Sequence, residues 1–122
     1  MHTWIPIGIA GAIGVLTRHA VQQLVPRHGG VPWGTLLVNA SGAFILGFLF
    51  TMIVRRFEVA MWIQEALLVG FLGGYTTFSA FSLETFLMIE HGRILLAVGY
   101  GLVRVIGGVA AVFAGIHLAR LF

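Results

Sequence analysis

The chain lacks cysteine and lysine, and it has few charged residues of either sign. The absence of cysteine among its 122 residues excludes disulfide bonds and thiolate metal sites. Charged residues make up only 9% of the chain, whereas an average soluble chain has about 25%. A soluble protein this small must cover a large surface with polar groups, and this sequence has too few. The scarcity of charge therefore favours a membrane protein.

The basic residues are all arginine, and there are seven of them against four acidic residues, which gives a net charge of +3. They are scattered singly or as the pair Arg55-Arg56 and form no basic patch, so we expect no nucleic-acid partner. The five histidines show no spacing typical of metal ligands. With no cysteine and no metal cluster in the sequence, we do not expect an enzyme.

Hydrophobic residues make up 59% of the chain and fall into four long runs. Each run exceeds the roughly 20 residues that cross the hydrocarbon core of a bilayer as a helix. Short polar connections separate the runs, so no room remains for a soluble domain. The sequence therefore predicts an all-α, multi-pass membrane protein with one four-helix transmembrane domain over residues 1–122. The runs are Trp4–Val25, Trp33–Val54, about Met61–Ile89 and Ile94–Phe122.

The arginines are divided evenly between the two sides that four spans would create. One side carries Arg55, Arg56 and Arg120, and the other carries Arg27 and Arg93, with Arg18 nearest to that side. Orientation in the membrane follows the imbalance of basic residues between loops, and here the imbalance is close to zero. Two interpretations stay open. Other signals orient the chain, or it inserts both ways and pairs as an antiparallel, dual-topology dimer.

The run Gly73–Ser82, which reads GGYTTFSAFS, interrupts the third segment with glycines and hydroxyls. Non-helical backbone at membrane depth is tolerated only where it is buried in protein or lines water. We therefore predict that the third helix is broken at mid-membrane. Carbonyls freed there would suit a hard cation such as sodium. The alternative is a kink whose backbone groups are satisfied by threonine and serine side chains.

Two phenylalanines follow the predicted break. Phe78 and Phe81 are three residues apart and are expected to share a helix face, next to the hydroxyls of Ser79 and Ser82. A phenyl ring has a positive edge, so two rings beside hydroxyl donors can replace part of the hydration shell of a small anion. A permeation path needs weak, repeated sites of this kind. Ordinary packing of the rings is the alternative.

Three further polar side chains are predicted to lie at membrane depth, where each is costly. An arginine near the centre of a span costs at least about 2.5 kcal/mol on insertion scales, and both Arg18 and Arg104 lie near the midpoint of their segments. They can snorkel, pair with Glu84 or line an aqueous vestibule. Asn39 can join two helices or line a pore.

The run GGYTTFSAFSLET at Gly73–Thr85 resembles the signature of the Fluc (CrcB) fluoride channels. GTLLVNASGAFILG at Gly34–Gly47 is similar to the second helix of that family, and Gly11 through Arg18 is similar to its first. The resemblance implies a dual-topology homodimer with two antiparallel pores, in the plasma membrane of a prokaryote (the inner membrane if the cell is Gram-negative). The implied role is passive exit of fluoride, which confers fluoride resistance.

The resemblance also assigns roles to individual residues. It implies a structural sodium ion at the dimer axis, held by the backbone carbonyls of Gly73 and Thr76. Phe78 and Phe81 would be the aromatic pair of each pore, with one ring from each subunit. The other implied pore residues are Asn39, Ser79, Thr77 and Tyr100, with Arg18 as a vestibule cation.

The fourth segment departs from the family pattern. Positions after Tyr100 that often carry hydroxyls in the family hold Arg104, Gly107 and Gly108 here. Either Arg104 takes over part of the attraction for the anion, as a second vestibule residue, or one half of the pore is altered, as in a member that pairs with a non-identical partner.

Two other functions compete with a channel. A small four-helix multidrug or guanidinium exporter would need a carboxylate in the first helix, whereas the first acidic residue here is Glu58. A subunit that only assembles, without transport, would not need the break or the phenylalanine pair.

Overall fold

The computed structural model describes residues 3–122, and the elements that it contains there are helices. Four helical spans are long and apolar enough to cross a membrane, and they match the predicted segments to within two residues at each end. The prediction of an all-α membrane protein with four spans is therefore confirmed. Of the five histidines, His2 lies outside the described residues. The spans are Trp4–Leu24, Trp33–Arg55, Met61–Glu90 and Ile94–Arg120.

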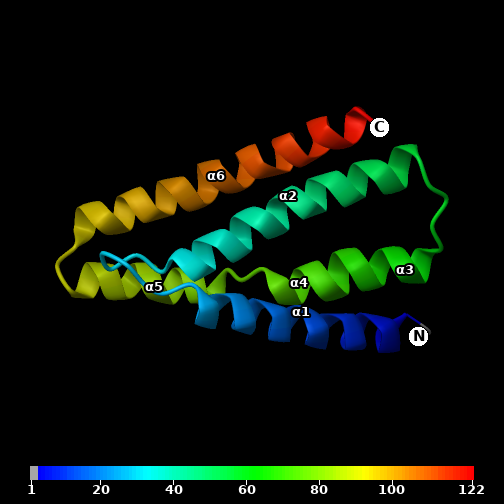
Figure 1. The fold of residues 1–122 in the computed structure, drawn as a ribbon. Helices are drawn as coiled ribbons and strands as arrows, with labels where there is room; N and C mark the ends of the chain where they lie inside the picture. Colours follow the sequence, from blue (N-terminus) through cyan, green and yellow to red (C-terminus); the bar gives the residue numbers. More distant parts are fainter. Residues whose placement is uncertain (1–2) are drawn as a thin grey trace.

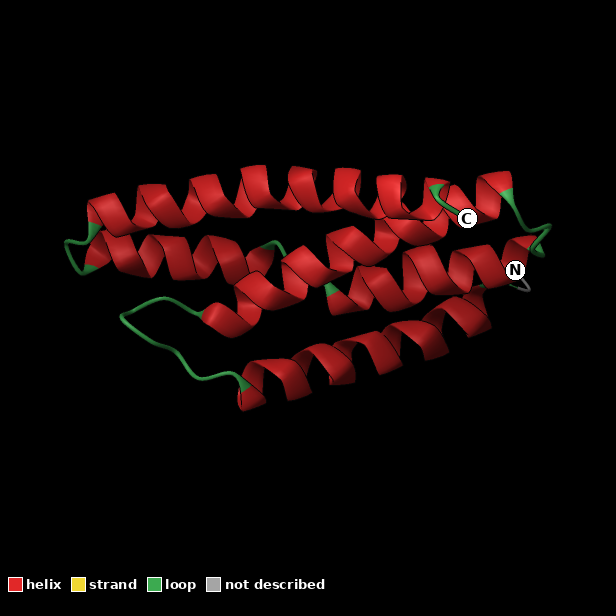
Figure 2. Ribbon diagram, turned by 45° about the horizontal axis from the view of Figure 1, so that its top comes forward, coloured by secondary structure: helices red, strands yellow, loops and turns green. Residues whose placement is uncertain are grey.

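Three of the spans are single helices, and the third is composite. The single helices are α1 (Trp4–Leu24), α2 (Trp33–Arg55) and α6 (Ile94–Arg120). The third span consists of α3 (Met61–Glu65), the π-helix η1 (Ala66–Phe71), α4 (Leu72–Tyr75) and α5 (Ser79–Glu90). In Figures 1 and 2, α6 runs beside α2, the third span follows, and α1 lies on its far side.

The ends of the spans divide as the sequence predicted. Both termini and the α2–α3 connection lie at one end of the bundle, and the other two connections lie at the opposite end (Figure 1). The α1–α2 connection turns at Gly29 and Gly30, whose φ angles of 62° and 79° are left-handed. Glycine adopts this conformation without the steric cost that a side chain imposes.

Arg55, Arg56 and Arg120 therefore belong to one end of the bundle, and Arg27 and Arg93 belong to the other.

Glycines set the close approach of the helices in two pairs. Between α1 and the third span, a Cβ atom at Gly70 would lie 2.7 Å from the carbonyl oxygen of Ile7, and one at Gly14 would collide with the carbonyl of Phe71. Between α2 and α6, a Cβ atom at Gly115 would collide with the carbonyl of Phe44. Small residues allow this approach where lipid leaves no hydrophobic drive for association.

The break in the third span is confirmed, but it falls slightly later than its glycines suggested. Gly73 and Gly74 are still helical in α4, and the chain leaves the helix at Thr76, whose ψ of 155° is extended. Gly74 lies in a helix that packs closely on α1. A Cβ atom at Gly74 would lie 2.5 Å from the carbonyl oxygen of Gly11. The interruption therefore covers residues 76–78.

The π-helix η1 was not predicted. It occupies Ala66–Phe71, directly before the last helical turn that leads to the break. A π-helix has one extra residue in its turn and is often found at functional sites. Here it changes the rotation of the span just before the chain leaves the helix.

Candidate functional site at the helix break

Asn39 of α2 holds the broken backbone. Its Oδ1 accepts a hydrogen bond from the Thr77 N–H at 2.9 Å, and its Nδ2 donates to the Thr77 carbonyl oxygen at 3.0 Å. The side chain of Asn39 is only 2% exposed. Because both backbone groups of Thr77 are paired in this way, the chain can leave the helix at membrane depth without unsatisfied groups at that residue.

The carbonyls on the α4 side of the break have different partners. The Gly74 carbonyl oxygen accepts a hydrogen bond from Arg18 Nε at 3.0 Å. Within residues 3–122 no hydrogen bond reaches the carbonyls of Gly73 or Thr76. Gly73 is exposed, and a Cβ atom there would meet nothing within 4 Å. The two carbonyls named from the sequence are therefore available for a further ligand, as is the carbonyl of Tyr75, which also accepts no hydrogen bond within these residues.

Arg18 does not pair with Glu84, which was one of the options for it. Arg18 binds the last turn of α4 instead, while Glu84 is 3.7 Å from Nη1 of Arg27. Glu84 also accepts hydrogen bonds from Thr35 at 3.0 Å and Tyr100 at 3.1 Å. This polar network at the end of the bundle was missed from the sequence, because it joins residues far apart in the chain.

The second half of the span begins directly after the break. Thr77 Oγ1 accepts a hydrogen bond from the Ala80 N–H at 3.2 Å, and Ser79 is the first residue of α5. The hydroxyls of Thr77 and Ser79 are 3.4 Å apart. Two of the predicted pore hydroxyls therefore lie together at the start of this helix.

The two phenylalanine rings lie together at the start of α5. Phe78 is the N-cap residue of α5, with helical φ and ψ angles of −92° and −35°, and Phe81 lies three residues further along that helix. Their ring centroids are 5.7 Å apart, with an interplanar angle of 56°. Phe81 is half-buried and contacts Tyr100 of α6, with 5.4 Å between ring centroids, whereas Phe78 is 70% exposed. Phe81 therefore has a fixed place, and Phe78 projects from the chain.

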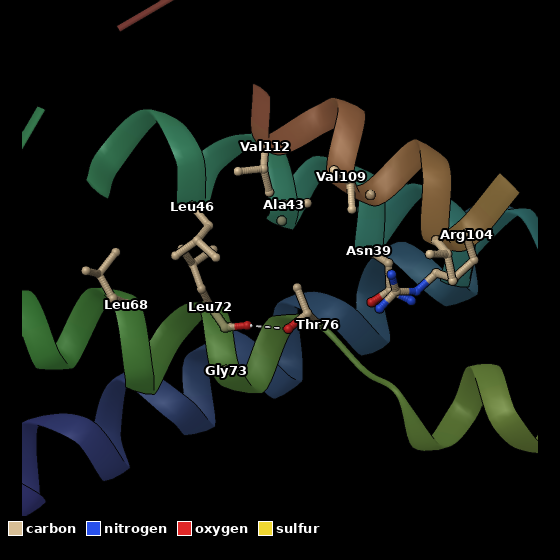
Figure 3. A pocket seen from close by; sticks show the side chains of 13 residues that line it. Asn39, Ala43, Leu46, Leu68, Leu72, Gly73, Thr76, Arg104, Val109 and Val112 are labelled. Atoms are coloured by element: carbon tan, nitrogen blue, oxygen red, sulfur yellow. Dashed lines mark hydrogen bonds between the residues drawn. The ribbon is translucent and has the colours of Figure 1, made fainter. Parts of the chain in front are cut away.

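A cavity of about 410 Å³ opens beside the break, between α2, α6 and the first half of the third span. Figure 3 shows its polar lining: Asn39, Thr76, and Arg104, which extends from α6 toward the Asn39 side. The Arg104 guanidinium carbon lies 5.6 Å from the centre of the Phe81 ring. The sequence-predicted residues thus gather in one region, except that Arg18 lies on the α1 side of the span.

The broken span presents two oppositely polarised helix ends to the same region. The carbonyl end of α4 carries a partial negative charge, and the amide end of α5 carries a partial positive one. In membrane transport proteins, broken helices use carbonyl ends for cations and amide ends for anions. This arrangement can therefore hold a cation near Gly73 and Thr76 and an anion near Ser79 and the phenylalanine rings.

Four membrane spans, one of them broken near its middle beside buried polar groups, define an integral membrane protein built to handle ions. The chain belongs to the family described as CrcB-like protein, Camphor Resistance (CrcB), whose model matches residues 5–116.

Curated relatives support the same assignment. A protein of Methylococcus capsulatus is 46% identical over 116 residues, which cover 93% of this chain and 51% of the relative. A protein of Rhizobium meliloti is 40% identical over 93% of both chains, and one of Pseudomonas syringae pv. tomato is 42% identical over 99% of both. Each of the three is named fluoride-specific ion channel FluC, which describes a channel and not an enzyme. The chain spans about half the length of the first relative and nearly all of the other two.

Proposed function

We propose that this chain is a fluoride-selective channel that lets cytoplasmic fluoride leave the cell passively and so confers fluoride resistance. The observation that carries the proposal is its 40–46% identity, over at least 93% of its length, to three relatives named as fluoride-specific channels. The channel lies in the plasma membrane of a prokaryote, which is the inner membrane in a Gram-negative cell.

The pore lies along the amide end of α5. Phe78 and Phe81 offer ring edges to the ion, and Ser79, Thr77 and Tyr100 supply hydroxyls. Asn39 supports the path by holding Thr77 in place, and Arg18 attracts anions toward the α4 side. The paired rings, 5.7 Å apart beside the polarised start of α5, support this route.

Two chains complete the channel as an antiparallel homodimer. Phe78 is 70% exposed in one chain. A second chain would cover this aromatic side chain and contribute a facing ring. The nearly even division of arginines, with three at one end and two at the other, supports insertion in both orientations. Pairing with a related, non-identical chain is the alternative, and mass spectrometry of the complex isolated from its native membrane separates the two.

A structural sodium ion lies at the dimer axis, bound by the carbonyls of Gly73 and Thr76 from each chain. These carbonyls accept no hydrogen bond within residues 3–122, and they lie at or just beyond the negative end of α4. Oxygen atoms are the ligands that hard cations prefer. When bound, the ion would neutralise the carbonyl ends that two antiparallel chains bring together.

The experiment is fluoride efflux from liposomes that contain the purified protein, measured with a fluoride electrode. We expect rapid fluoride efflux and little chloride efflux, each compared with protein-free liposomes. Fluoride efflux equal to that of empty liposomes would contradict the proposal and favour a subunit that only assembles. Proton-coupled guanidinium uptake without fluoride efflux would favour the exporter instead.

A further inference from the structure

Arg104 is a partly buried cation that has no counter-ion among residues 3–122. It lies near the middle of α6 (Ile94–Arg120), and its Nε atom is buried without a hydrogen-bond partner within residues 3–122. Glu84, one of the two acidic residues on the neighbouring α5, is already engaged by Arg27, Thr35 and Tyr100. An uncompensated charge at this depth is unfavourable, so Arg104 requires a partner that the described part of the chain does not supply.

The cavity beside the break offers few competing donors. The Asn39 amide uses its oxygen and one of its two N–H donors on the backbone of Thr77. The Thr76 hydroxyl donates to the Leu72 carbonyl oxygen at 2.8 Å, as the dashed line in Figure 3 marks. The backbone carbonyls of Gly73 and Thr76 are acceptors, so the charged donor of the lining is the guanidinium of Arg104, which has five N–H donors and no acceptor.

The surroundings of Arg104 leave room for its guanidinium on this side of α6. A Cβ atom at Gly108, one turn further along α6, would lie 3.1 Å from Arg104 Nη1, so the absence of a side chain there accommodates the group. The Phe81 ring is 5.6 Å from the guanidinium carbon and stabilises the cation from another side. The guanidinium is thus placed between the cavity and the phenylalanine pair.

We propose that Arg104 binds a small monovalent anion in this cavity, as a second anion site beside the phenylalanine pair. The proposal rests on the channel function proposed above, which supplies fluoride as the anion. A guanidinium is permanently charged, so the site would attract the ion at any physiological pH. Phe81 contacts both Phe78 and Arg104, and it would connect this site to the ring-lined part of the path.

Binding can be tested without transport by NMR of arginine-labelled (¹⁵N) protein in detergent micelles. Sodium fluoride replaces sodium gluconate at constant ionic strength, with sodium chloride in a parallel titration. The Arg104 Nε–H resonance is identified by its loss in Arg104→Lys. We expect this resonance to shift and saturate with fluoride. A resonance that stays in place would overturn the proposal and indicate that an oxygen of the second chain satisfies the guanidinium.

Flux provides the second arm of the test. Loss of one charge-assisted hydrogen bond weakens binding by about tenfold or more, so Arg104→Gln should raise the fluoride concentration for half-maximal efflux by about that factor. The matched control is Arg120→Gln, which removes an exposed charge from the end of the same helix and should leave efflux unchanged. If Arg104→Gln has the same fluoride efflux as the wild type, the Arg104 site is refuted and the proposed channel function still stands. An Arg104 shift in a protein without fluoride efflux would support the site and refute the channel.

Discussion

Asn39 and Thr77 form a two-point hydrogen-bonded pair in which one side-chain amide binds both backbone groups of a single residue. The two distances, 2.9 Å and 3.0 Å, are those of ordinary hydrogen bonds. The pair replaces the helical hydrogen bonds that Thr77 would make if the span continued. It connects α2 to the broken span at the point where the chain is extended.

Asn39→Ala should destabilise the protein by about 2 kcal/mol, because it leaves the partly buried N–H and carbonyl of Thr77 unpaired. The measurement is unfolding of the purified protein in detergent, followed by circular dichroism. Thr17→Val is the control, since the Thr17 hydroxyl bonds only the Ile13 carbonyl of its own helix. Equal stability of the two variants would show that the pair is not needed to hold the break.

Phe81→Ile should lower fluoride efflux by about tenfold, while the assembly stays intact. Aromatic pairs contribute about 0.5–1.5 kcal/mol beyond burial, and isoleucine removes the polarised ring edge but retains apolar volume. Efflux from liposomes gives the rate, and size-exclusion chromatography with light scattering gives the assembly state. The control is Phe86→Ile on the same helix, where the ring is 56% exposed. Normal efflux in Phe81→Ile would show that Phe81 contributes only to packing and not to the ion path.

Gly14→Ala should destabilise the bundle by about 1–3 kcal/mol, as is typical of overpacking. The new methyl group collides with the Phe71 carbonyl, which is rigid backbone of η1. Gly8→Ala is a matched substitution on the same helix, where a Cβ atom meets nothing within 4 Å. It should be neutral or stabilising by up to about 1 kcal/mol, because alanine favours the helix over glycine. Thermal unfolding of both variants in one detergent measures the difference, and a Gly14→Ala protein as stable as Gly8→Ala would show that α1 can move away.

Thorough replacement of sodium by a large organic cation should reduce fluoride efflux or weaken the dimer. The carbonyls of Gly73 and Thr76 would then face those of the second chain without a neutralising charge. Efflux and light scattering are measured before and after exchange through partial unfolding and refolding, so that a trapped ion is also released. Lithium and potassium serve as controls for ionic strength. Unchanged efflux and assembly would remove the central ion from the proposal.

The extent of the helices could be predicted from the sequence because hydropathy and the residues that end a helix act locally. Most ends of the four spans fall close to an arginine, proline or glycine that interrupts an apolar run. The position of the break was less certain, because Gly73 and Gly74 lower helix propensity in isolation but are held helical in α4, beside α1. The chain leaves the helix where Asn39 captures Thr77.

The sequence identified the residues of the candidate site, but it did not predict which residues they contact. The family signature identified Phe78 and Phe81, the similarity of the second segment identified Asn39, and the structure gathers all three at the break. The partners of Asn39 and Glu84 depend on how distant helices dock, which no local pattern encodes. The same is true of Arg104, whose place beside Phe81 follows from the packing of α5 against α6.

The π-helix η1 lies between the start of the third span and its break, and it changes the direction in which the side chains of α3 point relative to those of α4. One extra residue in a helix turns everything on one side of it by about 100° relative to the other side. Deletion of a single residue within Ala66–Phe71 would restore an ordinary helix and rotate Met61–Glu65 around the axis, while α4 could keep its glycine contacts with α1. One insertion or deletion in η1 can thus change the direction in which the side chains of Met61–Glu65 point. The polar groups at the break would stay in place.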